Sequence, residues 1–148
     1  TKEQAYRSVD GVESKGIEFE LDGKITNNWD MSFGITHFSA EDAAGKKVET
    51  LASRTTANLF TKYTLDKWSV GGGVNYKSAF YTGEGSQKIT QDAYALANLM
   101  VAYDIDQNIK AQLNINNLFD KKYYEGIGVN SMVYGEPRNA TLTFRYQF

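Results

Sequence analysis

The chain of 148 residues contains no cysteine and a single proline. Without cysteine there is no disulfide framework, no thiol nucleophile and no thiolate metal site. Proline is excluded from the interior of strands, so its scarcity favours a chain built from strands. The 16 basic and 18 acidic residues give a formal charge of -2. A nucleic-acid partner calls for a basic excess, which this chain lacks.

A long hydrophobic run is also missing. No segment approaches the roughly 18 consecutive apolar residues that a membrane-spanning helix needs. Spanning strands of a β-barrel alternate apolar and polar residues and therefore form no long apolar run. The lack of such a run does not exclude a β-barrel. Residue 1 is threonine and no signal peptide is visible. We therefore expect a mature chain or a piece of a longer one.

Aromatic residues are abundant, with 10 tyrosines, 8 phenylalanines and 2 tryptophans. The last eleven residues place them in alternation and end on Phe148. Apolar side chains fall on one side and polar ones on the other, as in a strand with one apolar and one polar face. The apolar side comprises Ala140, Leu142, Phe144, Tyr146 and Phe148. This ending is typical of a transmembrane β-barrel.

Similar alternation predicts seven strands, at about 14–26, 29–42, 54–65, 68–82, 92–105, 108–119 and 138–148. Charge sorts onto one face of them. The predicted polar face carries Glu18, Glu20, Asp22, Lys24, Asp30, Lys62, Lys77, Asp104, Lys110 and Arg145, and the central part of the apolar face carries no charged residue. Exclusion of charge is what contact with lipid imposes, since a basic residue at mid-bilayer costs about 2–4 kcal/mol.

The connections alternate between short and long. Short ones fall at 27–28, 66–67 and 106–107, and long ones at about 43–53, 83–91 and 120–137. Outer-membrane barrels have short periplasmic turns and long external loops. At the short-turn ends lies a predicted girdle of Trp29, Tyr63, Trp68, Tyr103, Tyr146 and Phe148. Seven strands place the start of the first one outside. Since bacterial barrels have an even number and begin in the periplasm, we expect at least one missing strand.

The segment from Asn114 to Tyr123, Asn-Ile-Asn-Asn-Leu-Phe-Asp-Lys-Lys-Tyr, resembles the penultimate strand of TonB-dependent outer-membrane receptors. The ending from Tyr134 to Phe148 and the opening Ser14-Lys15-Gly16-Ile17-Glu18-Phe19-Glu20 are similar to that family too. Arg54-Thr55-Thr56 and the strand 68–75 resemble the ferric-siderophore branch, with coprogen and hydroxamate receptors as the nearest likeness. The resemblance covers about residues 12–148.

This resemblance implies an all-β, antiparallel transmembrane barrel of the bacterial outer membrane, with 22 strands and a plug domain. Residues 1–148 would form one C-terminal segment holding its last seven strands, without the plug or the TonB-contacting box. The implied function is TonB-dependent uptake of a ferric siderophore, with the TonB-ExbB-ExbD complex acting through the missing N-terminal part. The siderophore is cargo, and no resident cofactor or metal is expected. Phe148 resembles the signal that the barrel-assembly machinery reads, and membrane lipid covers the apolar face.

Aromatic and cationic residues near the predicted external loops are the candidate ligand contacts. Flat rings and cationic groups suit a bulky, often anionic iron chelate. The candidates are Phe80, Tyr81, Tyr123, Tyr124, Tyr134, Arg54 and Arg138. The alternative is that they form an outer girdle and pack the loops.

Other polar residues have plainer interpretations. His37, near Ser32 and Ser39, invites a hydrolytic triad but has no supporting motif, so we expect an interfacial residue and no enzyme. Glu18, Glu20 and Asp22 offer oxygen ligands for a cation, or else partners for basic residues on adjacent strands or a plug. Glycines 71–73 form no phosphate loop and instead predict a kink, or room for a bulky neighbour such as a Tyr or Trp ring.

Three alternatives stay open beside the receptor. A small self-contained barrel with a structural or adhesive role fits the length but not the odd number of strands. An outer-membrane enzyme lacks a catalytic constellation. A soluble calyx for a lipophilic ligand has no reason for an aromatic girdle at its turns.

Overall fold

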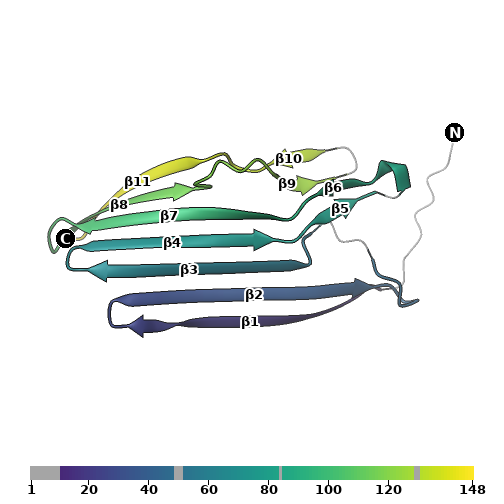
Figure 1. The fold of residues 1–148 in the computed structure, drawn as a ribbon, viewed down its shortest axis with the longest axis horizontal. Helices are drawn as coiled ribbons and strands as arrows, with labels where there is room; N and C mark the ends of the chain where they lie inside the picture. The colour runs from purple at the N-terminus through teal and green to yellow at the C-terminus, as the bar shows by residue number, and fades with distance from the viewer. Residues whose placement is uncertain (1–10, 49–51, 84, 129–130) are drawn as a thin grey trace.

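The computed structural model describes residues 11–48, 52–83, 85–128 and 131–148. Seven long strands form one antiparallel sheet in the order β1-β2-β3-β4-β7-β8-β11 (Figure 1). Their bounds are Glu13–Thr26 (β1), Trp29–Glu41 (β2), Thr55–Leu65 (β3), Trp68–Lys77 (β4), Tyr94–Asp104 (β7), Ile109–Asn116 (β8) and Asn139–Tyr146 (β11). All seven strands predicted from the alternation are therefore present. Each pairs with its sequence neighbour in the sheet, as an up-and-down barrel wall requires.

Two hairpins form at the long connections, and the alternation does not predict their pairing, although residues 80–82 fall within the predicted strand 68–82. Strands β5 (Phe80–Thr82) and β6 (Ile89–Gln91) pair around the short 3₁₀ helix η1 (Gly85–Gln87), and β9 (Tyr124–Ile127) pairs with β10 (Met132–Tyr134). The expected strand 68–82 was wrong in its extent, because β4 ends at Lys77. There the Ser78 hydroxyl accepts a hydrogen bond from the Thr55 amide (3.1 Å), and the chain then pairs within its own hairpin.

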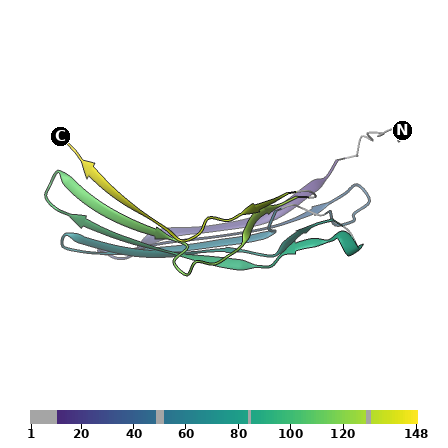
Figure 2. The same ribbon diagram turned by 90° about the horizontal axis from the view of Figure 1, so that it is seen from above.

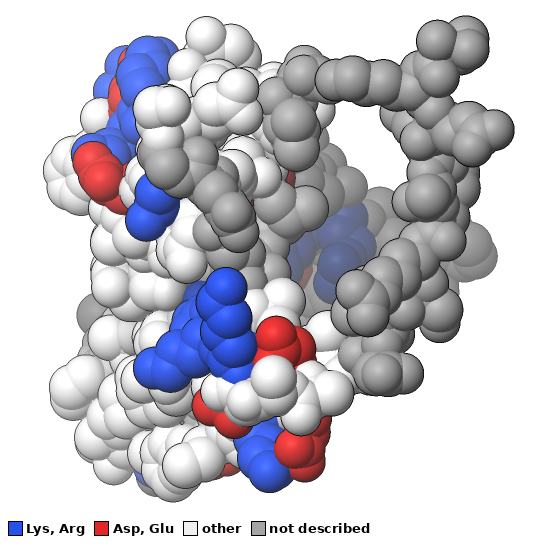
Figure 3. Space-filling model, turned by 90° about the vertical axis from the view of Figure 1, so that its right-hand side faces the viewer, with Lys and Arg blue, Asp and Glu red and all other residues white. Residues whose placement is uncertain are grey.

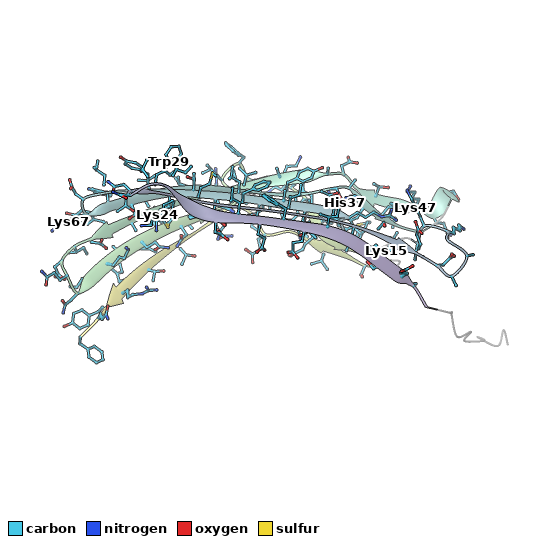
Figure 4. The ribbon with its side chains drawn as sticks, turned by 90° about the horizontal axis from the view of Figure 1, so that it is seen from below. Lys15, Lys24, Trp29, His37, Lys47 and Lys67 are labelled. Carbon is cyan, nitrogen blue, oxygen red and sulfur yellow. The ribbon has the colours of Figure 1, made fainter. Side chains whose placement is uncertain are left out.

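The pairing register confirms the predicted separation into two faces. Directly opposed residues of antiparallel strands point to the same side of a sheet. One unbroken row of opposed residues crosses six strands: Trp29, Tyr63, Val70, Val101, Leu113 and Leu142. The sheet is bowed along its strands (Figure 2), and Figure 4 shows the Trp29 side chain on the convex side. The face whose central part carries no charge is therefore convex, and the polar face is concave.

Charged side chains on the concave face pair across strands near the short turns. Asp30 on β2 contacts Lys62 on β3 (3.3 Å), and Asp104 on β7 contacts Lys110 on β8 (3.1 Å). These side chains are 37–44 % exposed. Such solvent-accessible pairs are worth about 0–1 kcal/mol each, so they support the register without determining it.

Aromatic side chains gather at the short-turn ends of the convex face, where the girdle was predicted. Trp29 opposes Tyr63, and its indole N–H donates to the Thr61 hydroxyl (2.6 Å). The rings of Trp68 and Tyr103 lie 4.5 Å apart between centroids. Within the described ranges, no helix is long and apolar enough to cross a membrane.

The best-packed part of the chain lies under the long loops rather than in the middle of the sheet. Phe80, Tyr94 and Ile127, each 4 % exposed, form a buried cluster against which Ile89, Leu96, Tyr123 and Tyr124 pack. By contrast, large apolar side chains in mid-sheet are open on the convex face, with Leu59 at 42 % and Val74 at 43 % exposed. The described residues thus form one small core, and it joins the two loop hairpins to the sheet.

Glycines 71 and 73 make room for a ring, as one interpretation of the sequence predicted. A methyl group at Gly71 would lie 3.0 Å from Cζ of Phe60 and 3.2 Å from Cε of Met100. At Gly73 it would lie 3.2 Å from Cδ2 of the same ring. Phe60 therefore lies along the concave face over both glycines. Gly72, on the convex face, faces only the Asn98 carbonyl oxygen, at 3.5 Å.

Replacing Gly71 with alanine should destabilise the sheet by about 1–3 kcal/mol, because the added methyl forces Phe60 and Met100 to move. Gly72→Ala is the matched control, since its methyl meets only ordinary van der Waals contact. Denaturant unfolding in detergent micelles measures both. Equal loss of stability in the two variants would contradict the packing of Phe60 described here.

A charge on the convex face should cost far more than one on the concave face. Val74→Arg is expected to destabilise the folded protein by about 2–4 kcal/mol if lipid covers this position. Asn75→Arg, its neighbour on the concave face, should change the stability by less than about 0.5 kcal/mol. Unfolding from lipid bilayers compares the two, and a similar cost for both would argue against lipid contact.

Candidate functional site

All seven candidate ligand residues lie at the long-loop end of the sheet, and the structure divides them by what they touch. We use the name loop platform for the β5–β6 hairpin (80–91, with residue 84 outside the described ranges) together with residues 117–128 and 131–138 of the next long connection. Figure 3 looks onto this end and shows small groups of basic side chains beside acidic ones. Charge of both signs is therefore interleaved around the platform on this view.

Phe80 and Tyr123 are anchors of the platform. Phe80 is 4 % exposed in the buried cluster. The Tyr123 ring packs against Tyr94, with centroids 4.5 Å apart and planes tilted by 32°, and it also lies directly against Gly135, where no Cβ fits. Burial, helped by the nearby Glu125 carboxylate, raises the pKa of Tyr123. In this conformation both rings hold loops together rather than face outward.

Tyr124 and Tyr134 form a second pair, closer to solvent. Their ring centroids lie 4.9 Å apart, and Tyr134 is 76 % exposed. A hydrogen bond to Tyr134 raises the pKa of the Tyr124 phenol. The two ring planes are tilted by 42° to each other, and together they present aromatic surface at an exposed tip, which suits a planar chelating group.

Tyr81, on the β5–β6 hairpin, and Arg54, just before β3, lie close together. With Lys47, Ala79 and others they line a hollow of about 230 Å³. Lys88 lies over the Tyr81 ring, its Nζ 3.8 Å from the centroid. Arg54 donates to the Val48 carbonyl oxygen (2.8 Å), which fixes one arm of its guanidinium. Cations beside an aromatic ring are chemistry suited to an anionic ligand.

Arg138 contributes through its backbone. Its N–H donates to Oδ1 of Asp120 (3.0 Å), and Oδ2 of Asp120 accepts from Lys122 (3.0 Å). These contacts, the Arg138 amide first, lower the pKa of the Asp120 carboxyl. The Arg138 side chain itself is exposed and is not brought near Tyr81 or Arg54 by any described contact.

The residue that organises the long connection was not among the predicted site residues. Asn117 is 4 % exposed and has a positive φ of 48°. Its Nδ2 donates to the carbonyl oxygens of Lys121 (2.9 Å) and Glu136 (3.0 Å), and its Oδ1 accepts from the Lys121 N–H (2.8 Å). Asparagine tolerates positive φ better than most residues, so Asn116-Asn117 held a signal for the end of β8. Its loop partners held none.

The other polar residues singled out from the sequence do not assemble a reactive site. His37 pairs with the Thr55 hydroxyl (2.8 Å) at the loop end of the convex face, whereas Ser32 points to the concave face. Glu18, Glu20 and Asp22 oppose Thr36, Gly34 and Ser32, so the adjacent strand supplies no basic partner. Among the described residues, no group of three or more acidic or histidine side chains is placed to hold a metal.

Comparison with known proteins connects this architecture to a family. The family described as "TonB dependent receptor-like, beta-barrel" matches residues 2–118. The ferric-pyoverdine 358 receptor of Pseudomonas putida is 41 % identical over 150 residues, which cover 97 % of this chain and 18 % of the receptor. The catecholate siderophore receptor Fiu of Escherichia coli K12 is 31 % identical over 148 residues, covering 90 % of this chain and 19 % of Fiu.

Solved structures agree. The crystal structure of the ferripyoverdine receptor of the outer membrane of Pseudomonas aeruginosa, bound to ferripyoverdine, matches with a TM-score of 0.83 and 35 % identity. The match covers 93 % of this chain and 20 % of that receptor. The chain thus spans about a fifth of the length of the relatives it matches.

Gly135→Ala should loosen the base of the long connection, because a Cβ there collides with the Tyr123 ring. The expected cost of about 1–3 kcal/mol should appear as local opening. Gly126→Ala on β9 is the control, since its Cβ would meet Val133 at 3.9 Å. Limited proteolysis reports the opening. Equal cleavage rates in the two variants would show that the Tyr123–Gly135 contact does not restrain the loop.

Proposed function

The chain belongs to the TonB-dependent receptor β-barrel family, and we propose that it forms part of the barrel wall of an outer-membrane receptor that imports a ferric siderophore. The observation that carries this proposal is the pairing of a convex face without charge in its central part with a loop platform that bears aromatic and cationic groups. The first suits a wall in lipid, and the second suits capture of an iron chelate from outside.

A larger closed barrel is the architecture that this sheet fits best. The described sheet is bowed but open, and β1 and β11 each have one neighbour within it. Unpaired strand edges are not tolerated in lipid, so both edges call for further strands. This favours the receptor, with the expected 22 strands and a plug, over the small self-contained barrel. It also fits an energy supply through TonB, ExbB and ExbD acting on parts outside residues 1–148.

The siderophore class is proposed from the relatives' names and the platform's chemistry. Ferric pyoverdines and catecholates are the ligands that those names give. The coprogen or hydroxamate specificity expected from the sequence stays a prediction. Whichever of these siderophore classes is bound, we propose Tyr81, Tyr124, Tyr134 and Arg54 as direct contacts. Phe80 and Tyr123 would pack beneath these contacts. Arg138, the remaining predicted residue, lies where the loop returns to the sheet, just before β11.

Two further partners follow from the same architecture. Lipid would cover the convex face, and the girdle of aromatic rings would lie at the periplasmic interface. Phe148, fully exposed and with its ring centroid 6.3 Å from that of Tyr146, is proposed as the end that the barrel-assembly machinery reads. We assign no resident metal, no enzymatic activity and no nucleic-acid partner to this segment.

The test uses the full-length receptor of which this chain is a segment. Cells that depend on it for iron are supplied with one ferric siderophore at a time, from pyoverdine, catecholate, coprogen and hydroxamate classes. We expect TonB-dependent growth and iron uptake with at least one of them. No uptake and no binding across the panel would contradict the proposal.

Arg54→Ala and Tyr81→Ala should each weaken binding of the recognised ferric siderophore about tenfold, or about 1.4 kcal/mol. The reason is loss of a cation or a ring from the hollow beside the β5–β6 hairpin. Arg145→Ala, on the concave face at the opposite end of the sheet, should leave the affinity unchanged. Fluorescence quenching by the ferric siderophore measures all three. An equal loss in all variants would remove the hollow from the site.

A further inference from the structure

The two long connections are tied into one body by a small number of contacts. Gln91, the last residue of β6, accepts the N–H of Tyr124 on its Oε1 (2.8 Å) and donates from Nε2 to the Asp92 carbonyl oxygen (2.8 Å). Its neighbour Thr90 pairs with Tyr81 across the β5–β6 hairpin. A single side chain therefore links the start of β9 to the end of β6.

Asn117 ties the two legs of the later connection to each other. Its side chain bonds to Lys121 on the outgoing leg and to Glu136 on the returning leg. Its own N–H donates to Oδ1 of Asn98 on β7 (3.1 Å), which fixes the base of both legs on the sheet. Breaking hydrogen bonds to buried polar groups costs more free energy than breaking an exposed pair, so these hydrogen bonds of Asn117 resist opening.

Further contacts join the two legs beyond the hydrogen bonds of Asn117. The Gly135 N–H donates to the Tyr123 carbonyl oxygen (2.9 Å), and Asp120 accepts from the Arg138 N–H (3.0 Å). Beneath both connections, Phe80 from β5 and Ile127 from β9 meet at Tyr94 in the buried cluster. The polar links and the cluster together restrain the positions of the two hairpins relative to each other.

We propose that Asn117 and Gln91 are positioning residues for ligand capture: they hold the β5–β6 and β9–β10 hairpins as one rigid body, so that Tyr81, Tyr124 and Tyr134 meet the siderophore in a fixed arrangement. Neither residue touches the ligand in this proposal. Pre-arranged contacts raise affinity because binding does not have to order them. The role in ligand capture rests on the proposed function. The claim that these two residues hold the hairpins together does not depend on that function.

The first measurement follows the hairpins without any ligand. The described chain has no cysteine, so Thr90→Cys and Glu125→Cys place one spin label on each hairpin, at exposed positions. Pulsed electron resonance on the full-length receptor, with any cysteines outside this segment replaced, should give a single narrow distance distribution. Asn117→Ala and Gln91→Ala should each broaden it. Unchanged distributions in both variants would overturn the proposal.

Matched variants separate positioning from general damage. Gln91→Glu keeps the oxygen that accepts from Tyr124 and should keep the narrow distribution. Asn28→Ala changes an exposed asparagine at the opposite end and should do the same. Retained heat-modifiable mobility on gels shows that each variant is folded. If Asn117→Ala fails to fold, Gln91→Ala, with a partly exposed side chain, decides the matter alone.

The second measurement is affinity for the ferric siderophore found in the growth test. Gln91→Ala should weaken binding about tenfold, or about 1.4 kcal/mol, with Gln91→Glu close to the unaltered receptor. Broadened distances with unchanged affinity would overturn the positioning role. Failure of the unaltered receptor to bind any siderophore would instead contradict the proposed function, and the distance measurement would still show whether Asn117 and Gln91 hold the hairpins together.

Discussion

The register between neighbouring strands is the constraint on which the rest of this structure depends. A slip of one residue in any pair would turn every side chain of a strand to the other face. Lys62 would then project from the convex face, and Leu59 would enter the concave one. The two-residue turns 27–28 and 66–67 leave little freedom for such a slip. Short turns and separation of charge therefore favour the same register.

Packing is distributed unevenly along the strands, which has consequences for dynamics. In mid-sheet the strands are joined mainly by backbone pairing, and their apolar side chains are open on the convex face. At the loop end, the cluster of Phe80, Tyr94 and Ile127 adds a buried core. Local opening is governed by such buried contacts. The two long connections that form hairpins are therefore fixed at their base.

The sequence predicted the sheet well because a period of two can be read over the eight or more residues of each long strand. It did not predict β6, β9 and β10, which have three or four residues each and show no alternation of their own, and it took β5 for the end of the preceding strand. It predicted that an aromatic ring packs over Gly71 and Gly73, but not that this ring is Phe60, because Phe60 comes from the neighbouring strand. The role of Asn117 depends on where Glu136 returns, and that is a property of the folded loop. The candidate contacts were predicted as a region, and their division into anchors and exposed groups needed coordinates.

That division follows the same physical rule as the faces of the sheet. Phe80 and Tyr81 are consecutive, as are Tyr123 and Tyr124, and successive residues of an extended chain point to opposite sides. In each pair the first ring packs into the structure, Phe80 within the buried cluster and Tyr123 against Tyr94, whereas the second ring is partly exposed, although Tyr124 also packs against the cluster. Tyr81 then lies beside Lys88, and Tyr124 beside Tyr134. An aromatic pair in an extended loop can thus supply one residue that orders the loop and one that is left for a ligand. The first makes the position of the second definite, which is why the buried rings matter for recognition even where they touch no ligand.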